Sequence, residues 1–402
     1  MDWLQSYLDE VKNSESPQRY FIWSGLTAIS AVLRDNVWLD RGGLYDLFPN
    51  IFTVFIGPSG IKKGNPVTFA RKLVKLTGNT RVYTGRLTIE KLINELSKSY
   101  SLETGEIMKD AIALFSAGEF SSFIARNPEA LTILTDLYNT HEYRDEDWIN
   151  YTKKDDKERL HHPCITLIGA SNETHFKEVV PDNAVGGGFI ARTFLVQSSK
   201  RGKLNSLTEK MKEPDLKCLA EYLKELSKLK GEFQWSHEGK QVYDKWYYEF
   251  GETDRNDETG TLNRITDSVL KVAMLLSCSR NTELMLYPED IVSAIDLCED
   301  VVLGIKKLTA GAGRNPLAPQ QLMIIRFLLK QEDYRASRED ILDKHWGHFD
   351  SYDLERIIQT MSDAKQIEVV SLNHGPKYRL SPKIIENFEK KILGKGKQKE
   401  EE

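Results

Sequence analysis

The sequence has few cysteines, no strong excess of charge and no long apolar segment, and each absence argues against a class of protein. Its four cysteines lie far apart and none forms a Cys-x-x-Cys pair, so neither a disulfide framework nor a zinc knuckle is indicated. A net charge of −5 means that any contact with nucleic acid must come from a local basic patch. No apolar run approaches the ~20 residues that cross a membrane, and Met1-Asp2-Trp3 does not begin a signal-peptide pattern. We therefore expect a cytoplasmic protein with no membrane contact.

What the sequence does contain is an alternation of short apolar strands and helices over about residues 49–200. The predicted strands are 51–57, 80–85, 111–119, 164–171 and 191–197. Helical stretches follow the first three strands, and this alternation indicates an α/β domain with a mainly parallel sheet. Residues 1–48 are predicted to be helical, and within them the stretch 20–33 is apolar almost all round, which predicts a buried helix.

The C-terminal half is predicted to hold a helical region and a separate small domain. Residues 201–310 are predicted to be entirely helical, and 309–319 to be a linker rich in Gly, Ala and Pro. Residues 311–385 show three helices and then two strands around an Asn-His-Gly turn, which is the pattern of a winged helix. The third of these helices is acidic, so a duplex groove and a protein partner are both open as its target. Residues 386–402 alternate Lys and Glu and are predicted to be disordered.

The stretch FIGPSGIKKGNP, residues 55–66, lies between a predicted strand and a predicted helix and approaches the phosphate-binding pattern GxxxxGK[ST]. In that pattern backbone N–H groups wrap the phosphates, the lysine reaches the β and γ oxygens, and the hydroxyl ligates Mg²⁺. Lys62 stands where the last glycine is expected, and Gly64 stands where the hydroxyl is expected. The alternative is a Gly-Pro turn with solvent-facing lysines. The predicted nucleotide-binding residues of this loop are Gly57, Ser59, Gly60, Lys62, Lys63, Gly64 and Asn65.

Three polar residues at the ends of later strands could complete a hydrolytic site. The third strand ends in Gly118-Glu119, where a Walker B strand ends in Asp-Glu; the acid that polarises water is present and the Asp that supports Mg²⁺ is absent. Asn172 follows the fourth strand, and Arg192 opens the fifth after a run of three glycines. Alternatively, Glu119 is an ordinary surface residue and Arg192 has only a packing role. The order of these residues along the chain favours a functional site.

Residues 51–198 together resemble the core of AAA+ ATPases: a P-loop, an acid on the third strand, a polar sensor on the fourth and an arginine finger before the fifth. The segment DWINYTKKDDKERLHHPCITLIG is similar to the pre-sensor hairpin of minichromosome-maintenance helicases and superfamily III viral helicases. GFIARTFLV resembles the arginine-finger segment of the former, and Arg264 lies where such proteins carry a second sensor on a helical lid. Over about residues 20–300 the chain also resembles phage and plasmid P-loop proteins that contain GPSG-x-x-K and are often fused to primases.

The resemblance implies a homo-oligomeric ring that binds ATP and Mg²⁺ between subunits, with no other metal site. Glu119 would orient the attacking water, Asn172 would position it, and Arg192 would reach the γ-phosphate of a neighbouring subunit. The implied architecture is an AAA+-like core (49–200) preceded by N-terminal helices and followed by a helical lid (201–310) and the winged helix.

The segment that resembles a pre-sensor hairpin would project into the pore of the ring. Its lysines, Lys153, Lys154 and Lys157, would contact single-stranded DNA. The alternative is that TKKDDKER is a solvated polar turn without a binding role. Two functions therefore stay open: an ATP-driven replicative helicase of a phage or mobile element, and a catalytically weak loader or scaffold that binds nucleotide together with DNA or a replication partner such as a primase.

Overall fold

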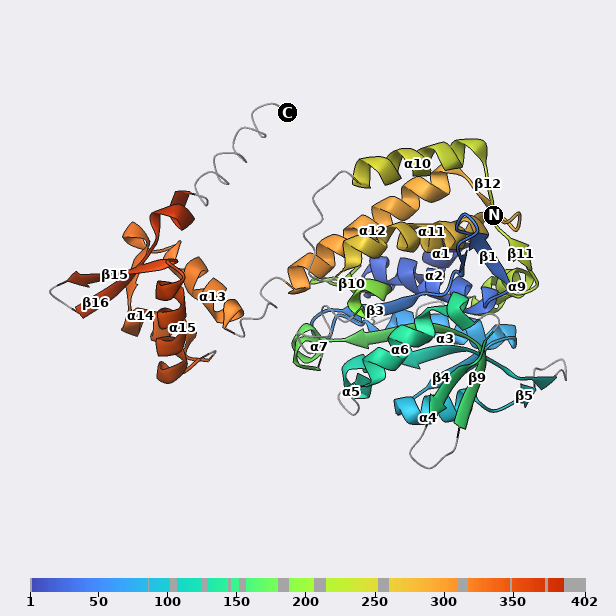
Figure 1. Ribbon diagram of the computed structural model, residues 1–402, viewed down its shortest axis with the longest axis horizontal. Helices are drawn as coiled ribbons and strands as arrows, with labels where there is room; N and C mark the ends of the chain where they lie inside the picture. Colours follow the sequence, from blue (N-terminus) through green and yellow to red (C-terminus); the bar gives the residue numbers. More distant parts are fainter. Residues whose placement is uncertain are drawn as a thin grey trace. The chain divides into compact units, whose positions relative to one another are not determined.

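The computed structural model describes residues 2–85, 87–101, 107–124, 129–143, 146–151, 157–179, 188–205, 215–251, 260–309, 317–347, 349–372 and 375–386. The chain divides into two compact units, Met1–Leu308 and Thr309–Glu402 (Figure 1). Each unit has a hydrophobic core of its own.

The larger unit is built on a mostly parallel sheet. Its parallel strands lie in the order β10 (Thr193–Gln197), β3 (Phe52–Ile56), β9 (Lys157–Ser171), β7 (Asp110–Ala117) and β4 (Arg81–Thr84). A short strand, β8 (Trp148–Tyr151), pairs antiparallel with the first residues of β9. The prediction of an α/β fold with a mainly parallel sheet is confirmed. Because the strands are parallel, their carboxyl ends form one edge of the sheet and their amino ends form the other.

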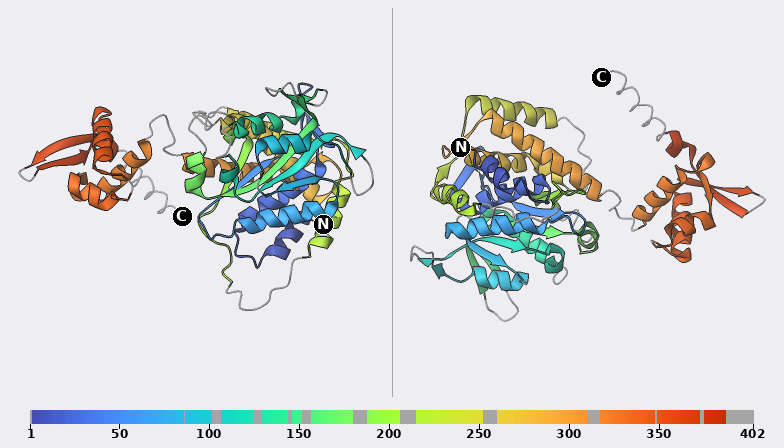
Figure 2. Two further views of the ribbon diagram at one scale, coloured as in Figure 1. Left: turned by 90° about the horizontal axis from the view of Figure 1, so that it is seen from below. Right: turned by 180° about the vertical axis from the view of Figure 1, so that it is seen from behind.

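Helices cover both faces of this sheet, which explains why its strands are apolar on both sides. Every residue of β3 is buried. Helices α2 (Gln18–Leu33) and α3 (Gly64–Thr77) lie on one face, and α4 (Ile89–Leu96), α5 (Phe120–Ile124) and α6 (Ala130–Tyr138) lie on the other (Figures 1 and 2). Most of α2 is buried, as its apolar sequence predicted.

Further helices pack around this centre and belong to the same core. They are α1 (Trp3–Val11), α7 (Glu173–Val179), α9 (Leu216–Leu226), α10 (His237–Gly251), α11 (Thr261–Arg280) and α12 (Pro288–Thr309), with 3-10 turns η1 (Thr140–Tyr143) and η2 (Ile190–Arg192). Helix α11 is buried over most of its second half and contacts both α2 and η2. Within the residues described, no helix has the length and apolar content that a bilayer span needs.

Two segments that were predicted to be wholly helical contain strands. Between residues 1 and 48, β1 (Val37–Asp40) pairs with β2 (Asp46–Leu47) and with β11 (Gly231–Glu232). Between residues 201 and 310, β12 (Gln234–Trp235) pairs with β13 (Met285–Leu286). These predictions were wrong because β11, β12 and β13 are only two residues long and most of the pairs join distant parts of the chain, which local periodicity does not reveal.

The smaller unit consists of three helices and an antiparallel three-stranded sheet. In chain order its elements are α13 (Ala318–Leu328), η3 (Glu332–Tyr334), β14 (Arg335–Ser337), α14 (Arg338–His345), α15 (Ser351–Asp363), β15 (Ile367–Leu372) and β16 (Gly375–Leu380). The sheet order is β14-β16-β15. The three helices and the terminal pair of strands were predicted, whereas the three-residue β14 was too short to be recognised.

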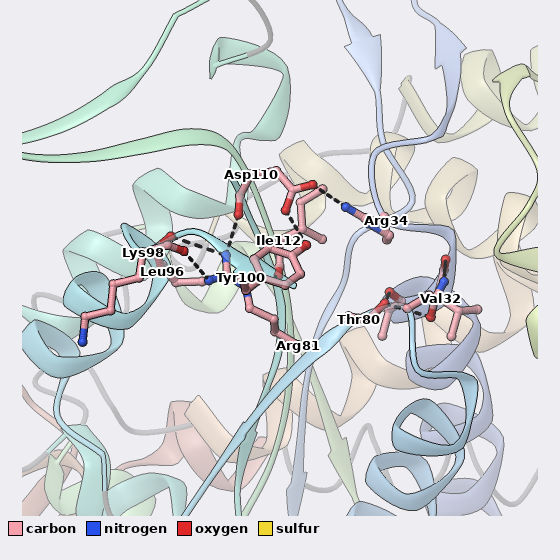
Figure 3. A network of polar contacts seen from close by, with 11 residues as sticks. Val32, Arg34, Thr80, Arg81, Leu96, Lys98, Tyr100, Asp110 and Ile112 are labelled. Carbon is pink, nitrogen blue, oxygen red and sulfur yellow. Dashed lines mark hydrogen bonds and ion pairs between the residues drawn. The ribbon is translucent and has the colours of Figure 1, made fainter. Parts of the chain in front are cut away.

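A polar network joins the start of β7 to the end of α2 and to strand β5 (Tyr100–Ser101), which pairs with β6 (Ile107–Met108) (Figure 3). Asp110 accepts hydrogen bonds from Arg34 and from the Tyr100 hydroxyl, the latter at 2.6 Å. The guanidinium carbon of Arg81 lies 4.1 Å from the centroid of the Tyr100 ring. The side chains of Arg34 and Asp110 are only 9% and 13% exposed, so this ion pair is nearly buried.

Replacing Asp110 by Ala would leave the buried Arg34 guanidinium without its carboxylate. We expect the free energy of unfolding to fall by about 3–5 kcal/mol, because a buried charge that loses its partner is strongly unfavourable. Chemical denaturation followed by circular dichroism measures this loss. The control variant Glu225→Ala removes one partner of the exposed pair with Lys228 and should change stability by less than about 1 kcal/mol. Equal losses for the two variants would contradict the assignment.

Candidate nucleotide site and a second basic cavity

The loop that joins β3 to α3, Gly57–Lys63, stands at the carboxyl edge of the sheet and is here called the glycine loop. Its first residue is hydrogen-bonded to the neighbouring strand, since the Gly57 N–H donates to the Ser171 carbonyl at 3.3 Å. In the loop and just after it, residues 58–60, 62, 64 and 65 are exposed, whereas Gly57 is buried and Lys63 is half-buried. Most of the predicted nucleotide-binding residues of this region are therefore open to solvent at one edge of the sheet.

Glycine is required at two positions of the loop for different reasons. A Cβ on Gly57 would lie 2.6 Å from the Ser198 carbonyl and 2.7 Å from the Tyr20 hydroxyl, so a side chain cannot fit there. Gly60 has a φ of 82°, in the left-handed region that glycine adopts without strain. Lys62 also lies in this region, with a φ of 62°, and its carbonyl accepts a 2.7 Å hydrogen bond from the Ser16 hydroxyl. The loop is thus held in a curled conformation by its neighbours.

Lys63 folds back over this curled loop. Its ammonium group donates to the carbonyls of Gly57 at 3.0 Å and Pro58 at 3.2 Å. Partial burial lowers the pKa of Lys63, and nearby Glu119 opposes that shift. The sequence placed Lys63 as the phosphate lysine, and the structure places its ammonium over the loop with an acid close by.

Helix α3 adds an open N-terminus to the loop. Its N-cap residue, Lys63, makes no side-chain capping bond, and its first turn carries no acidic residue. The first backbone N–H groups of such a helix attract anions. Pro66 lacks an N–H, so the first turn offers one donor fewer than usual. The arrangement suits a phosphate group but supplies it with a reduced set of backbone donors.

Glu119 and Asn172 are brought to the same edge by the strand order. β9 lies directly beside β3, with Ile56 paired to Ser171, and β7 lies on the other side of β9. Glu119 is exposed in the turn after β7. Asn172 follows β9 and caps α7, because its Oδ1 accepts from the His175 N–H at 2.7 Å and its amide contacts His175 Nδ1 at 3.0 Å. The two residues therefore lie on the same side of the glycine loop, with Asn172 the nearer in the sheet.

Two buried hydroxyls fix these strand ends to each other. The Ser121 hydroxyl, from the start of α5, is hydrogen-bonded to the Ser171 hydroxyl at the end of β9. Both side chains are buried. This contact holds the turn that carries Glu119 against the strand that carries Asn172.

Arg192 and Arg264 lie at the opposite, amino edge of the sheet. Arg192 directly precedes β10, whose first residue pairs with Phe52 at the start of β3. Since β3 is five residues long, this edge is about 17 Å from the glycine loop. The resemblance counted Arg264 among the nucleotide-binding residues, as a second sensor on a helical lid; it lies beside Arg192 and not beside the loop of its own chain.

These two arginines line a cavity of about 300 Å³. Arg192 donates to Asn139 Oδ1 at 3.2 Å and to the Gly188 carbonyl at 3.1 Å. Burial lowers the pKa of Arg192, and the like charge of Arg264 lowers it further. Arg264 is exposed and has no hydrogen-bond or ion-pair partner among the described residues. Two acids, Glu142 and Asp267, also line the cavity, and Asp267 is already paired with Arg41. The two adjacent arginines attract an anion at the part of the cavity that they line.

Lys271 also lines this cavity and was not among the predicted site residues. Its side chain is 4% exposed, and its ammonium donates to the Asn50 carbonyl at 3.0 Å and to Asn50 Oδ1 at 2.7 Å. Burial lowers the pKa of Lys271 to about 7. The signal was present in the sequence, because a single lysine inside the apolar run SVLKVAMLL must find a partner if the helix is buried. Lys271 therefore joins helix α11 to Asn50, two residues before β3 begins.

The predicted pre-sensor hairpin begins at the amino edge as well. In the antiparallel pair of β8 and β9, Trp148 lies opposite Leu160 and Tyr151 lies opposite Lys157. These residues of β9 precede His161, where the pairing of β9 with β7 begins. Tyr151 is exposed. Lys157 opens β9, whereas Lys153 and Lys154 lie outside the described residues.

A second cavity, of about 430 Å³, opens beside the start of the glycine loop. It lies between that loop, the residues after β10 and helix α12, and its walls include Pro58, Gln197, Ser198, Asp300 and Leu303. Its volume is within the range of small-molecule sites. A ligand held by its phosphates at the loop would therefore have room for a further group next to it.

The residues at the carboxyl edge fit a magnesium ion only as a companion of bound phosphates. Among the described residues no group of three His, Cys, Asp or Glu side chains could hold a metal. Gly64 has no side-chain oxygen, and the acids at this edge include Glu119, after β7, and Glu173, after β9. Mg²⁺ commonly keeps several waters and takes phosphate oxygens with one or two protein ligands. Glu119 would be one such ligand or the partner of a bound water.

Compared with protein-family models and with curated proteins, the chain matches none.

Proposed function

We propose that this chain is an ATP-dependent motor on nucleic acid that works as a ring of identical subunits, as in a replicative DNA helicase. One observation carries the proposal: the candidate site is divided between the two edges of one sheet. The glycine loop, Glu119 and Asn172 stand at the carboxyl edge, and Arg192 stands at the amino edge. A single chain cannot bring them together across about 17 Å.

A second copy of the chain removes this difficulty. If the amino edge of one subunit faces the carboxyl edge of the next, Arg192 and Arg264 reach a phosphate held by the neighbour's Lys63. Such an interface is head-to-tail, and repeated head-to-tail contacts close into a ring when the rotation allows. An arginine supplied in this way stabilises the charge that develops in phosphoryl transfer, with an effect of about 10³–10⁵ on the rate.

The arrangement of elements supports an AAA+-type core. Strand β3, which carries the loop, lies between β9 and β10, the fourth and fifth parallel strands along the chain. The helices after β10 would form a lid. In the smaller unit, the sequence of α13, β14, α14, α15 and the β15–β16 hairpin supports a winged helix. That domain would bind duplex DNA or a replication partner such as a primase.

A second function, a loader or scaffold that binds nucleotide without efficient turnover, is favoured by one specific feature. Gly64 and Gly118 occupy the positions where a magnesium hydroxyl and an acid are usual, so two ligands of the metal are missing. Steady-state ATP hydrolysis with and without single-stranded DNA separates the two functions. We expect slow hydrolysis that DNA accelerates; ATP binding without any DNA-stimulated turnover would select the loader, and failure to bind ATP would exclude both.

The hairpin lysines provide a separate test of the nucleic-acid part of the proposal. In the double variant Lys153→Ala, Lys154→Ala, we expect weaker binding to single-stranded DNA and a salt dependence flattened by about 0.7 per lost phosphate contact on logarithmic axes. Fluorescence anisotropy of labelled oligonucleotides over a series of salt concentrations measures both. Hydrolysis in the absence of DNA should stay unchanged. Identical binding curves for the parent and the double variant would assign these lysines to a solvated turn.

A further inference from the structure

The segment that follows β10 returns across the glycine loop and is joined to it through the residues before α2. The Ser198 N–H donates to the Ile56 carbonyl at 3.1 Å, and the Gly202 N–H donates to the Glu15 carbonyl at 2.8 Å. A side chain at Gly202 would not fit, because its Cβ would lie 2.5 Å from the Ser16 carbonyl. Since Ser16 in turn bonds the Lys62 carbonyl, three segments are fixed together around the loop.

This arrangement places the side chain of Arg201 next to the glycine loop. Its Nη2 lies 3.6 Å from the position that a Cβ on Gly60 would occupy. Its ion pair with Glu15 is long, at 3.6 Å between Nη1 and Oε1, which is beyond hydrogen-bonding distance. In the described part of the chain, Arg201 has no hydrogen bond. Its guanidinium is therefore held near the loop while its donors are unused.

The loop needs additional donors because of its own composition. Gly64 supplies no hydroxyl, and Pro66 supplies no backbone N–H to the first turn of α3. A guanidinium offers several donors in a planar fork that matches two oxygens of one phosphate. Arg201 is 46% exposed and Glu15 is 11% exposed, so the arginine can exchange its long ion pair for a phosphate without unfolding its surroundings.

We propose that Arg201 binds the phosphates of the nucleotide at the glycine loop of its own chain, and that Glu15 is its partner when the phosphates are absent. The inference rests on the proposed nucleotide-binding function and adds a residue to it. Arg201 acts in the same subunit as the loop, in contrast to Arg192, which acts on the neighbour. It also gives the site a preference for nucleotides with two or three phosphates.

Isothermal titration with ADP, ATP and adenosine tests this role. We expect Arg201→Ala to weaken the binding of ADP and ATP by about 10- to 100-fold, since hydrogen bonds to charged groups have this magnitude. Binding of adenosine, which has no phosphate, should not change. Arg201→Lys keeps the charge but loses the fork, and should give an intermediate loss. The control Lys203→Ala removes an equal charge two residues away, where Lys203 contacts Asn13, and should bind ADP like the parent.

The variant Glu15→Gln gives a prediction of opposite sign. Releasing Arg201 from its partner should tighten ADP binding, and this gain should disappear in the double variant with Arg201→Ala, because the gain passes through Arg201. Parent-like ADP affinity of Arg201→Ala overturns the role of Arg201. If Lys63→Ala still loses ADP binding in that case, the proposed function survives; if the parent itself binds neither ADP nor ATP, both proposals fail.

Discussion

The variant Lys63→Ala is expected to lose nucleotide binding altogether. The ammonium group of Lys63 lies over the curled loop, 3.0 Å from the Gly57 carbonyl. No other lysine in the described part of the chain folds back over the loop in this way. A phosphate bound there would replace neutral carbonyl acceptors with anionic oxygens, so that both partners of each hydrogen bond to the ammonium are charged. Fluorescence of a labelled ATP analogue, titrated with protein, measures the loss directly.

Lys62→Ala is the matched control for this variant. The neighbouring lysine has the same charge, but its side chain is exposed and its φ of 62° turns it away from the regular path into α3. Its loss should weaken binding only modestly, because an exposed charge near a phosphate is screened by solvent. Equal ATP affinity of Lys63→Ala and the parent would reject Lys63 as the phosphate lysine. A larger effect at Lys62 than at Lys63 would exchange their roles.

The strands that carry the site could be predicted because parallel strands buried on both faces are continuous apolar runs. The stretches around Phe52–Ile56 and Thr193–Gln197 have this form, and polar residues at their ends indicate where the sheet meets solvent. The carboxyl-edge location of the loop, Glu119 and Asn172 follows from that pattern alone, since each directly follows an apolar run.

Features that depend on contacts between distant segments could not be predicted. The chain turns from helix to strand after Arg34 because β1 pairs with β11, which belongs to a different region of the sequence. The family resemblance placed Arg264 with the nucleotide as a second sensor; only the packing of α11 against η2 shows that it lies beside Arg192. Arg201 was missed for the same reason, because its approach to Gly60 depends on the return of a loop across three segments.

The hydrolytic site is expected to be divided between two subunits. Arg192→Ala should bind ATP and hydrolyse it poorly, because the charge of the transition state is not neutralised. Glu119→Gln should also bind ATP without turnover, because the attacking water is not oriented. The two changes damage different edges of the sheet. In a mixed ring, a subunit with intact Glu119 can therefore face a subunit with intact Arg192.

Mixing the two inactive variants should restore part of the hydrolysis rate. Random assembly of equal amounts makes about a quarter of head-to-tail interfaces complete, so about that fraction of parent activity is expected if interfaces act independently. A mixture of Glu119→Gln with Lys63→Ala is the control, since both changes damage the carboxyl edge and no interface can be repaired. Restoration in the first mixture and none in the second would require that Arg192 acts on a neighbour. If Arg192→Ala and Glu119→Gln both fold and bind ATP but restore no hydrolysis on mixing, Arg192 is a packing residue that closes the amino-edge cavity, and only residues of the same chain act on the nucleotide at the glycine loop.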